Sequence, residues 1–209
     1  MSGSRERVLA RVRAALADVP RDEAPQDVAV PRDYSPAHDR GEAAELLVDR
    51  LEDYKALVHR TSPEGLAGDI ARALARRGTH RVAAPADAPA DWFGSTEVEV
   101  VRDGGLDIAG LDGMDGVVTG CAAAIAETGT IVLDAGEAQG RRALTLIPDY
   151  HLCVVRGDQI VAGVPQALPR LDPRRPLTWI SGPSATSDIE LDRVEGVHGP
   201  RTLEVMIVD

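Results

Sequence analysis

Apolar residues near the N-terminus stand three and four positions apart among arginines, at Val8, Leu9, Val12, Ala15 and Leu16. This spacing is the period of an amphipathic helix and predicts one from about Ser4 to Ala17. Four prolines follow, at Pro20, Pro25, Pro31 and Pro36, and they favour extended backbone. We therefore expect residues 1–36 to form a helix and a Pro-rich linker. The helix either packs on its own domain or docks onto a partner.

Residues 37–209 are expected to form an α/β domain in which helices and strands alternate. In the first half, helices are predicted over Asp39–Tyr54 and Ser62–Arg77, and strands over Ala56–His59, His80–Ala84 and Glu97–Val101. In the second half, strands are predicted over Gly116–Thr119, Thr130–Leu133, Leu152–Val155, Leu177–Ile180 and Leu203–Val208, with helices over Glu137–Leu144 and Ile160–Leu168. The strands are continuous apolar runs, which are typical of a mainly parallel sheet covered on both faces, as in a three-layer sandwich.

Composition narrows the classes of function. The 209 residues carry a net charge of -11 and only 3% aromatic residues, which argues against a nucleic-acid partner. No apolar run approaches the roughly 18 residues of a membrane span, and the N-terminus lacks the apolar block of a signal peptide. We therefore expect a soluble cytoplasmic protein without a membrane span. The two cysteines, Cys121 and Cys153, match no metal or haem signature and are expected to be buried thiols.

Three loops combine glycine with small polar residues. The first is Ala126–Thr130, where Gly129 permits a tight turn that displays Glu127, Thr128 and Thr130. A partly desolvated Glu127 could serve as a general base or nucleophile. The alternative is a simple hairpin turn with a solvated glutamate.

The second loop, Ile180–Glu190, carries four hydroxyl groups followed by two carboxylates. Backbone amides around Gly182, with Ser181 and Ser184, could hold an anion. Asp188 and Glu190 are candidates for acid–base or orienting roles, although Ser187 and Glu190 also match a helix capping box. The loop lacks the Gly-Lys-Ser/Thr ending of a nucleotide-hydrolase phosphate loop.

The third loop, Gly196–Arg201, places His198 between glycines and beside Arg201. A histidine there could titrate near neutral pH, and the arginine could bind an anion. A structural role for His198 is the alternative. Among the other histidines, His151 alone is placed to join these loops. No histidine has the spacing of a metal site, and none is assigned to a metal.

Taken together, I-A-E-T-G-T at 125–130, L-I-P-D-Y-H at 146–151, I-S-G-P-S-x-x-S-D-I-E at 180–190 and G-V-H-G-P-R at 196–201 resemble the LUD domain of the lactate utilization protein C family. The resemblance implies a Rossmann-like fold similar to phosphosugar isomerases and CoA-transferases. It also implies membership of a system that oxidises L-lactate to pyruvate, in which sister proteins carry the iron–sulfur clusters. No cofactor is expected on this chain.

Three hypotheses follow. The first is a cluster-free subunit of a lactate oxidation complex, with iron–sulfur proteins as partners and a pocket that binds a small anion or docks a partner. The second is a stand-alone enzyme acting on a phosphorylated sugar or an acyl-CoA, with Glu127 as the catalytic group. The third is a structural adaptor that works through the N-terminal helix. The sequence names neither the ligand nor the oligomeric state.

Overall fold

The computed structural model describes residues 3–20, 22, 24–27, 29–31, 43–186, 194–195 and 199–209. The chain divides into two compact units, Met1–Ser35 and Pro36–Asp209. The first unit contains α1 (Ser4–Ala15) and a short 3-10 helix, η1 (Pro25–Asp27). Helix α1 contains no buried residue, and Val8, Val12 and Leu16 on it and just beyond it are 58%, 48% and 56% exposed.

The second unit is built around a six-stranded main sheet in which every neighbouring pair of strands is parallel. The strand order across this sheet is β1-β12-β7-β4-β2-β3. Its strands are β1 (Leu57–Thr61), β2 (Arg81–Pro85), β3 (Glu99–Asp103), β4 (Gly116–Thr119), β7 (Tyr150–Arg156) and β12 (Thr202–Val208). The α/β class and the mainly parallel sheet predicted from the sequence are confirmed.

A second, four-stranded sheet has the order β8-β5-β6-β9. It contains β5 (Ala123–Ile125), β6 (Thr130–Leu133), β8 (Ile160–Val161) and β9 (Thr178–Ile180). Strand β6 pairs antiparallel with both β5 and β9, so two of the strands predicted from the sequence belong to this sheet and not to the parallel one. A third, two-stranded pairing joins β10 (Ala185–Thr186) to β11 (Val194–Glu195).

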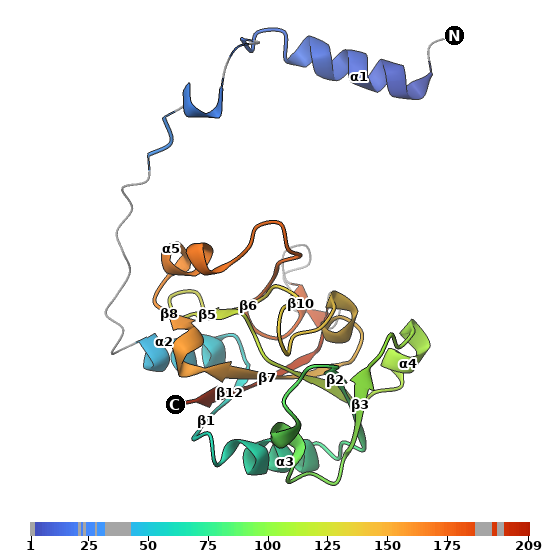
Figure 1. The fold of residues 1–209 in the computed structure, drawn as a ribbon, viewed down its shortest axis with the longest axis vertical. Coiled ribbons are helices and arrows are strands. Elements are labelled where there is room, and N and C mark those ends of the chain that lie inside the picture. The colour runs from blue at the N-terminus through green and yellow to red at the C-terminus, as the bar shows by residue number, and fades with distance from the viewer. Residues whose placement is uncertain are drawn as a thin grey trace. The chain divides into compact units, whose positions relative to one another are not determined.

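The helices of this unit are α2 (Ala43–Asp53), α3 (Leu66–Arg76), α4 (Ile108–Asp112) and α5 (Val164–Ala167), with 3-10 helices η2 (Ala90–Phe93), η3 (Arg142–Thr145), η4 (Gly157–Gln159) and η5 (Leu168–Arg170). Figure 1 shows α3 on one side of the main sheet, with α2 and the second sheet on the other side. Successive side chains of a strand point to opposite faces of the sheet, so each strand contributes to the apolar packing on both sides of it. In β12, Leu203, Val205 and Ile207 pack toward α2, and Met206 packs toward α3.

Two predicted helices differ from the structure. The segment Glu137–Leu144 is a turn followed by η3, because Ala138 and Gly140 have left-handed φ values of 57° and 68° that a helix cannot include. The segment Ile160–Leu168 is strand β8 followed by the short helix α5, because Gly163 is extended, with φ of -147°. Helix α3 begins at Leu66 and not at Ser62, whose carbonyl oxygen accepts from the amides of Gly65 and Leu66.

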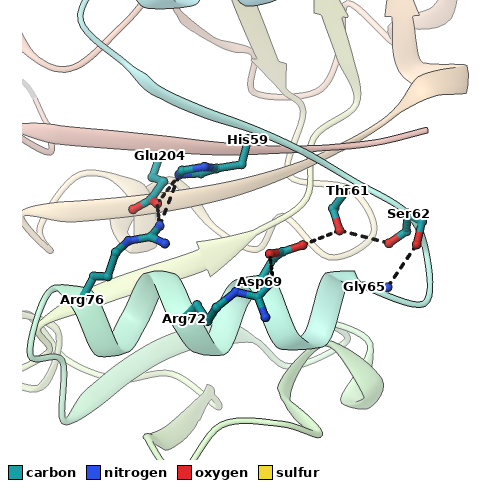
Figure 2. A network of polar contacts seen from close by, with 8 residues as sticks. All are labelled: His59, Thr61, Ser62, Gly65, Asp69, Arg72, Arg76 and Glu204. Atoms are coloured by element: carbon teal, nitrogen blue, oxygen red, sulfur yellow. Dashed lines mark hydrogen bonds and ion pairs between the residues drawn. The ribbon is translucent and has the colours of Figure 1, made fainter.

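Polar contacts fasten α3 to the neighbouring strands β1 and β12 (Figure 2). The carboxylate of Glu204, on β12, accepts from Arg76 at 2.9 Å and contacts Nε2 of His59 at 2.7 Å. At the other end of the helix, the hydroxyl of Thr61 donates to Asp69 at 2.6 Å, and Arg72 also contacts Asp69. Side chains therefore link β1 to both ends of α3 and β12 to its C-terminal end, in addition to the apolar packing.

Candidate functional site

A cavity of about 200 Å³, here called the first cavity, lies at the amino ends of β7 and β12. His151 and Leu203 are the second residues of these strands and are partners in the register of the sheet. The loop after β9 and the segment before β12 complete the wall. The other lining residues are Arg142, Thr145, Thr178, Trp179, Ile180, Ser181, Gly182, Pro183, Ser184, Gly199 and Pro200.

Arg142 supplies the positive charge of the first cavity. Desolvation lowers the pKa of Arg142, but a guanidinium stays protonated at any physiological pH. Its NH1 group donates to the hydroxyl of Thr145 at 3.1 Å. A partly desolvated guanidinium beside hydroxyl groups is a strong ligand for carboxylates. This chemistry favours a small organic anion in the cavity.

His151 is 1% exposed, and its imidazole contacts the hydroxyl of Thr119. The hydroxyl of Thr119 donates to the carbonyl oxygen of Gly120 at 2.9 Å, and its oxygen lies 2.8 Å from Nε2 of His151. Because a hydroxyl has one proton, Thr119 accepts from His151, which assigns the imidazole proton to Nε2.

A chain of hydroxyl groups joins two of the loops that the sequence singled out. Thr128 and Thr130 lie 2.7 Å apart, and Thr130 lies 2.8 Å from Ser181, measured between hydroxyl oxygens. Thr130 is 4% exposed, whereas Ser181 lines the first cavity. The structure therefore brings Thr128, Thr130 and Ser181 together.

Glu127 is exposed at the turn between β5 and β6. It lines a separate depression together with Arg50, Asp53, Tyr54 and Thr128, and it is not part of the first cavity. This geometry matches the hairpin alternative. The Glu127 carboxylate therefore does not lie among the side chains that line the first cavity.

Gly129 and Gly182 have packing roles against the end of α2. Gly129 has φ of 57°, and a Cβ atom there would lie 2.7 Å from Cβ of Arg50. Gly182 has φ of 87°, and its Cβ would lie 2.6 Å from Cβ of Tyr54. At both positions the backbone is left-handed and lies close to α2. These two requirements explain why glycine stands there, with no need for a bound ligand.

The amide of Ser184 donates to the carbonyl oxygen of Pro200 at 2.8 Å, which closes the wall of the first cavity. Arg201 is the next residue, and its guanidinium pairs with Asp149 at 2.7 Å. The hydrogen bond from Arg201 holds the pKa of Asp149 below its usual range. Arg201 does not line the cavity.

Asp188, Glu190 and His198 lie outside the described residues, and their roles stay predictions. The sequence reasoning missed Arg142, Thr145 and Thr119. Arg142 fell within a predicted helix, and the signal that could have found it is the Arg141–Arg142 pair just before the L-I-P-D-Y-H motif. His151, singled out from the sequence, does line the first cavity.

The two cysteines are buried and unpaired by any disulfide, as predicted. A thiol–thiol hydrogen bond with Cys121 lowers the pKa of Cys153 to about 6, with a smaller contribution from His151. The same hydrogen bond and burial raise the pKa of Cys121 well above its usual value.

Among the described residues, no group of three or more His, Cys, Asp or Glu is arranged to hold a metal ion. Within the same residues, no helix has the length and hydropathy needed to cross a membrane.

Comparisons with a family model and with known proteins point to the same family. The family model described as the LUD domain matches residues 109–208. A lactate utilization protein C from Deinococcus radiodurans is 52% identical over 174 residues, which cover 81% of this chain and 81% of that protein. A lactate utilization protein C from Shouchella clausii is 35% identical over 92 residues, which cover 41% of this chain and 40% of that protein.

A solved structure is also similar. The crystal structure of a DUF162 family protein from Deinococcus radiodurans superposes with a TM-score of 0.71 at 43% sequence identity. The match covers 82% of this chain and 99% of that one. The α/β architecture described above is therefore the architecture of that family.

Proposed function

Because the chain belongs to the LUD domain family of lactate utilization proteins, we propose that it is a component of an L-lactate oxidation system and that its first cavity binds a small carboxylate. The similarity to proteins named lactate utilization protein C supports the role in lactate utilization. In this proposal, partner proteins carry the iron–sulfur clusters, and this chain binds lactate, pyruvate or a closely related anion.

One observation carries the proposed site: Arg142, His151 and Ser181 line the same cavity. The guanidinium of Arg142 would hold the carboxylate group. Ser181 and His151 would bind the oxygen at the neighbouring carbon, since a hydroxyl and an imidazole can each donate or accept. Trp179 and Leu203 would contact the methyl group. A cavity of about 200 Å³ is large enough for a three-carbon acid.

The two tryptophans of the chain allow a direct test, because Trp179 lines the first cavity and Trp92 does not. In a Trp92→Phe variant, all tryptophan fluorescence comes from Trp179. We expect L-lactate or pyruvate to change this signal in a saturable way. Arg142→Gln should raise the dissociation constant at least about tenfold, since a charge-assisted hydrogen bond is lost. Arg174→Gln is the control, because Arg174 is 88% exposed.

Other outcomes would contradict the proposal. Binding of sugar phosphates or CoA esters in place of lactate and pyruvate would favour the stand-alone enzyme. If Arg142→Gln binds lactate as well as the unaltered cavity does, Arg142 is not the anion ligand. In cells that depend on this protein for growth on lactate, Arg142→Gln should slow growth and Arg174→Gln should not.

A further inference from the structure

A second cavity, of about 280 Å³, lies at the carboxyl edge of the main sheet. Gly120 and Cys121, which line it, directly follow β4, and Arg156 is the last residue of β7. Trp92, in η2, comes after β2 and forms an apolar part of the wall. Because β7 begins at the first cavity and ends at this one, the two cavities lie at opposite edges of the sheet.

The connections of the strands place the second cavity where a ligand is expected. The chain passes from β2 outward to its neighbour β3 and then returns to β4, on the other side of β2. This reversal leaves a crevice between the carboxyl ends of β2 and β4. In open α/β sheets, ligands bind at such a switch point. The second cavity is lined from both of these strand ends.

Three arginines from separate segments line this cavity in a chain whose net charge is -11. Arg156 and Arg170 lie close together, because both contact Asp158. Nε of Arg156 is 3.0 Å from a carboxylate oxygen of Asp158, and Arg170 donates to its carbonyl oxygen at 2.9 Å. The side chains of Arg156 and Asp158 are 60% and 72% exposed, so their ion pair is weak and an incoming anion can displace it.

The third guanidinium, of Arg175, is held in place by Asp134 at 2.7 Å. The Asp134 carboxylate also accepts from the amide of Gly136 at 2.9 Å, which fixes its orientation. Glu137, which is exposed, also lines the cavity. A guanidinium has five N–H donors, more than these contacts use. The carboxylates therefore position the arginines and leave donors for a ligand.

The wall next to Arg175 is preformed. Ala135 and Ala138 have φ values of 55° and 57°, which are unfavourable for residues with a Cβ atom and concentrate at functional sites. Contacts from other strand ends hold this conformation. The amide of Ala138 donates to Asp87 at 3.0 Å, and its carbonyl oxygen accepts from Gly120 at 2.7 Å.

From the crevice, the arginines and the preformed wall, we infer that the second cavity binds a small molecule with a doubly charged oxyanion group. Arg156, Arg170 and Arg175 are its ligands. Guanidinium groups suit phosphate and carboxylate oxygens because they donate in pairs from one plane. Three of them offer donors for more oxygen atoms than the single carboxylate of lactate has. The group is either a phosphate monoester or a vicinal dicarboxylate.

The test uses a Trp179→Phe variant, in which Trp92 is the only tryptophan and reports on the second cavity. It is titrated with inorganic phosphate, succinate and L-lactate at constant ionic strength. We expect a saturable change with a dianion, and the tighter of phosphate and succinate identifies the chemistry. Arg170→Gln should weaken binding at least about tenfold, whereas the exposed Arg174→Gln should leave it unchanged.

Arg142→Gln, in the first cavity, should also leave dianion binding unchanged, so failure here is distinguishable from failure of the proposed function. The absence of saturation with both dianions would overturn the inference. Equal affinity in Arg170→Gln and Arg174→Gln would do the same. Arg170 is exposed, so its variant is expected to fold, and circular dichroism checks this.

Discussion

At the scale of single residues, Glu204 is a charged side chain inside the apolar packing between the main sheet and α3. Its side chain is only 2% exposed, and its carboxylate contacts His59, Arg76 and the hydroxyl of Tyr150, the last at 2.7 Å. Burial and then the charge of Glu204 raise the pKa of Tyr150 far above its usual value. Tyr150 therefore stays neutral and donates. A buried carboxylate is tolerated because each of its oxygens has a donor.

The first prediction concerns this carboxylate. Glu204→Gln keeps the shape of the side chain but removes its charge. The new NH2 group replaces a carboxylate oxygen that accepts hydrogen bonds, so it meets neighbouring donors where an acceptor is needed. We expect the free energy of unfolding to fall by about 2 kcal/mol, measured by urea denaturation. Glu45→Gln is the control, because Glu45 pairs with Arg60 on the surface, at 63% exposure, and should leave the midpoint almost unchanged. Equal effects of the two substitutions would show that Glu204 contributes no more than a surface charge.

The second prediction concerns acid stability and rests on Asp103. Its side chain is 7% exposed, and the hydrogen bond from Arg141, at 2.7 Å, holds its pKa below the usual range. The folded-state pKa is thus lower than the unfolded value of about 3.9. Asp103 therefore stabilises the fold above that pH, and this contribution is lost as the pH falls through the folded-state pKa.

Asp103→Asn should accordingly flatten the dependence of the unfolding free energy on pH between about 5 and 2. The measurement is a series of urea unfolding curves at several pH values. Asp53→Asn is the control, because Asp53 is 72% exposed and lies 3.5 Å from Arg50. A curve for Asp103→Asn parallel to that of the unaltered protein would contradict the prediction.

At the scale of elements, the end of α2 serves as a platform on which two loops rest. Gly129, in the β5–β6 hairpin, packs on Arg50, and Gly182, after β9, packs on Tyr54. The second loop forms part of the first cavity, so its distance from α2 sets the shape of that cavity. Any side chain at Gly182 must push the loop away from Tyr54.

The third prediction compares two glycines with left-handed backbone. Gly182→Ala meets both an unfavourable φ of 87° and a Cβ contact of 2.6 Å. Gly78→Ala, just after α3, has φ of 65° and no atom within 4 Å. Gly78→Ala should cost about 1 kcal/mol of unfolding free energy, and Gly182→Ala about 1–3 kcal/mol more from overpacking. Thermal unfolding measures both. A smaller loss for Gly182→Ala would mean that the loop moves freely.

The spacing of apolar residues and the positions of glycine and proline were enough to predict most helices and strands. The apolar runs at Gly116–Thr119 and Leu203–Val208 are buried strands, and Gly78, with its left-handed φ, does end α3. An apolar run does not indicate whether the strand pairs parallel or antiparallel with its neighbours. Strands β6 and β9 look like parallel strands in sequence but pair antiparallel. Strand β5 is hidden because Ala123–Ile125 is too short and too rich in alanine to give a strand signal.

The site was partly predictable for a similar reason. Ser181 and Ser184 could be named because hydroxyls beside glycine are visible in sequence, and both line the first cavity. Thr119 could not, since it contacts His151 from the neighbouring strand β4. Arg142 was missed because its segment was predicted to be a helix, although the Arg141–Arg142 pair is visible in the sequence. The sequence also did not indicate which edge of the sheet these loops occupy: the first cavity lies at the amino ends of β7 and β12.

At the scale of the whole molecule, the unit Met1–Ser35 carries apolar side chains that are exposed on its own helix. Helix α1 buries no residue, yet three apolar side chains, Val8, Val12 and Leu16, recur on one helical face and are about half exposed. The proposed lactate oxidation system requires contact with iron–sulfur proteins. An amphipathic helix that can enter an apolar groove of a partner is a common means of such contact.

The last prediction separates stability from assembly. Deletion of Met1–Pro36 should leave the thermal unfolding midpoint of the remaining chain unchanged, because α1 contributes no buried residue. The same deletion should abolish co-purification with the iron–sulfur partners, and Val12→Asp in the full chain should weaken it by placing a charge on the apolar face. Arg11→Asp, at an exposed neighbouring position, is the control for charge. If the truncated chain keeps its partners, the second unit makes the contact; if its midpoint drops, α1 stabilises the fold.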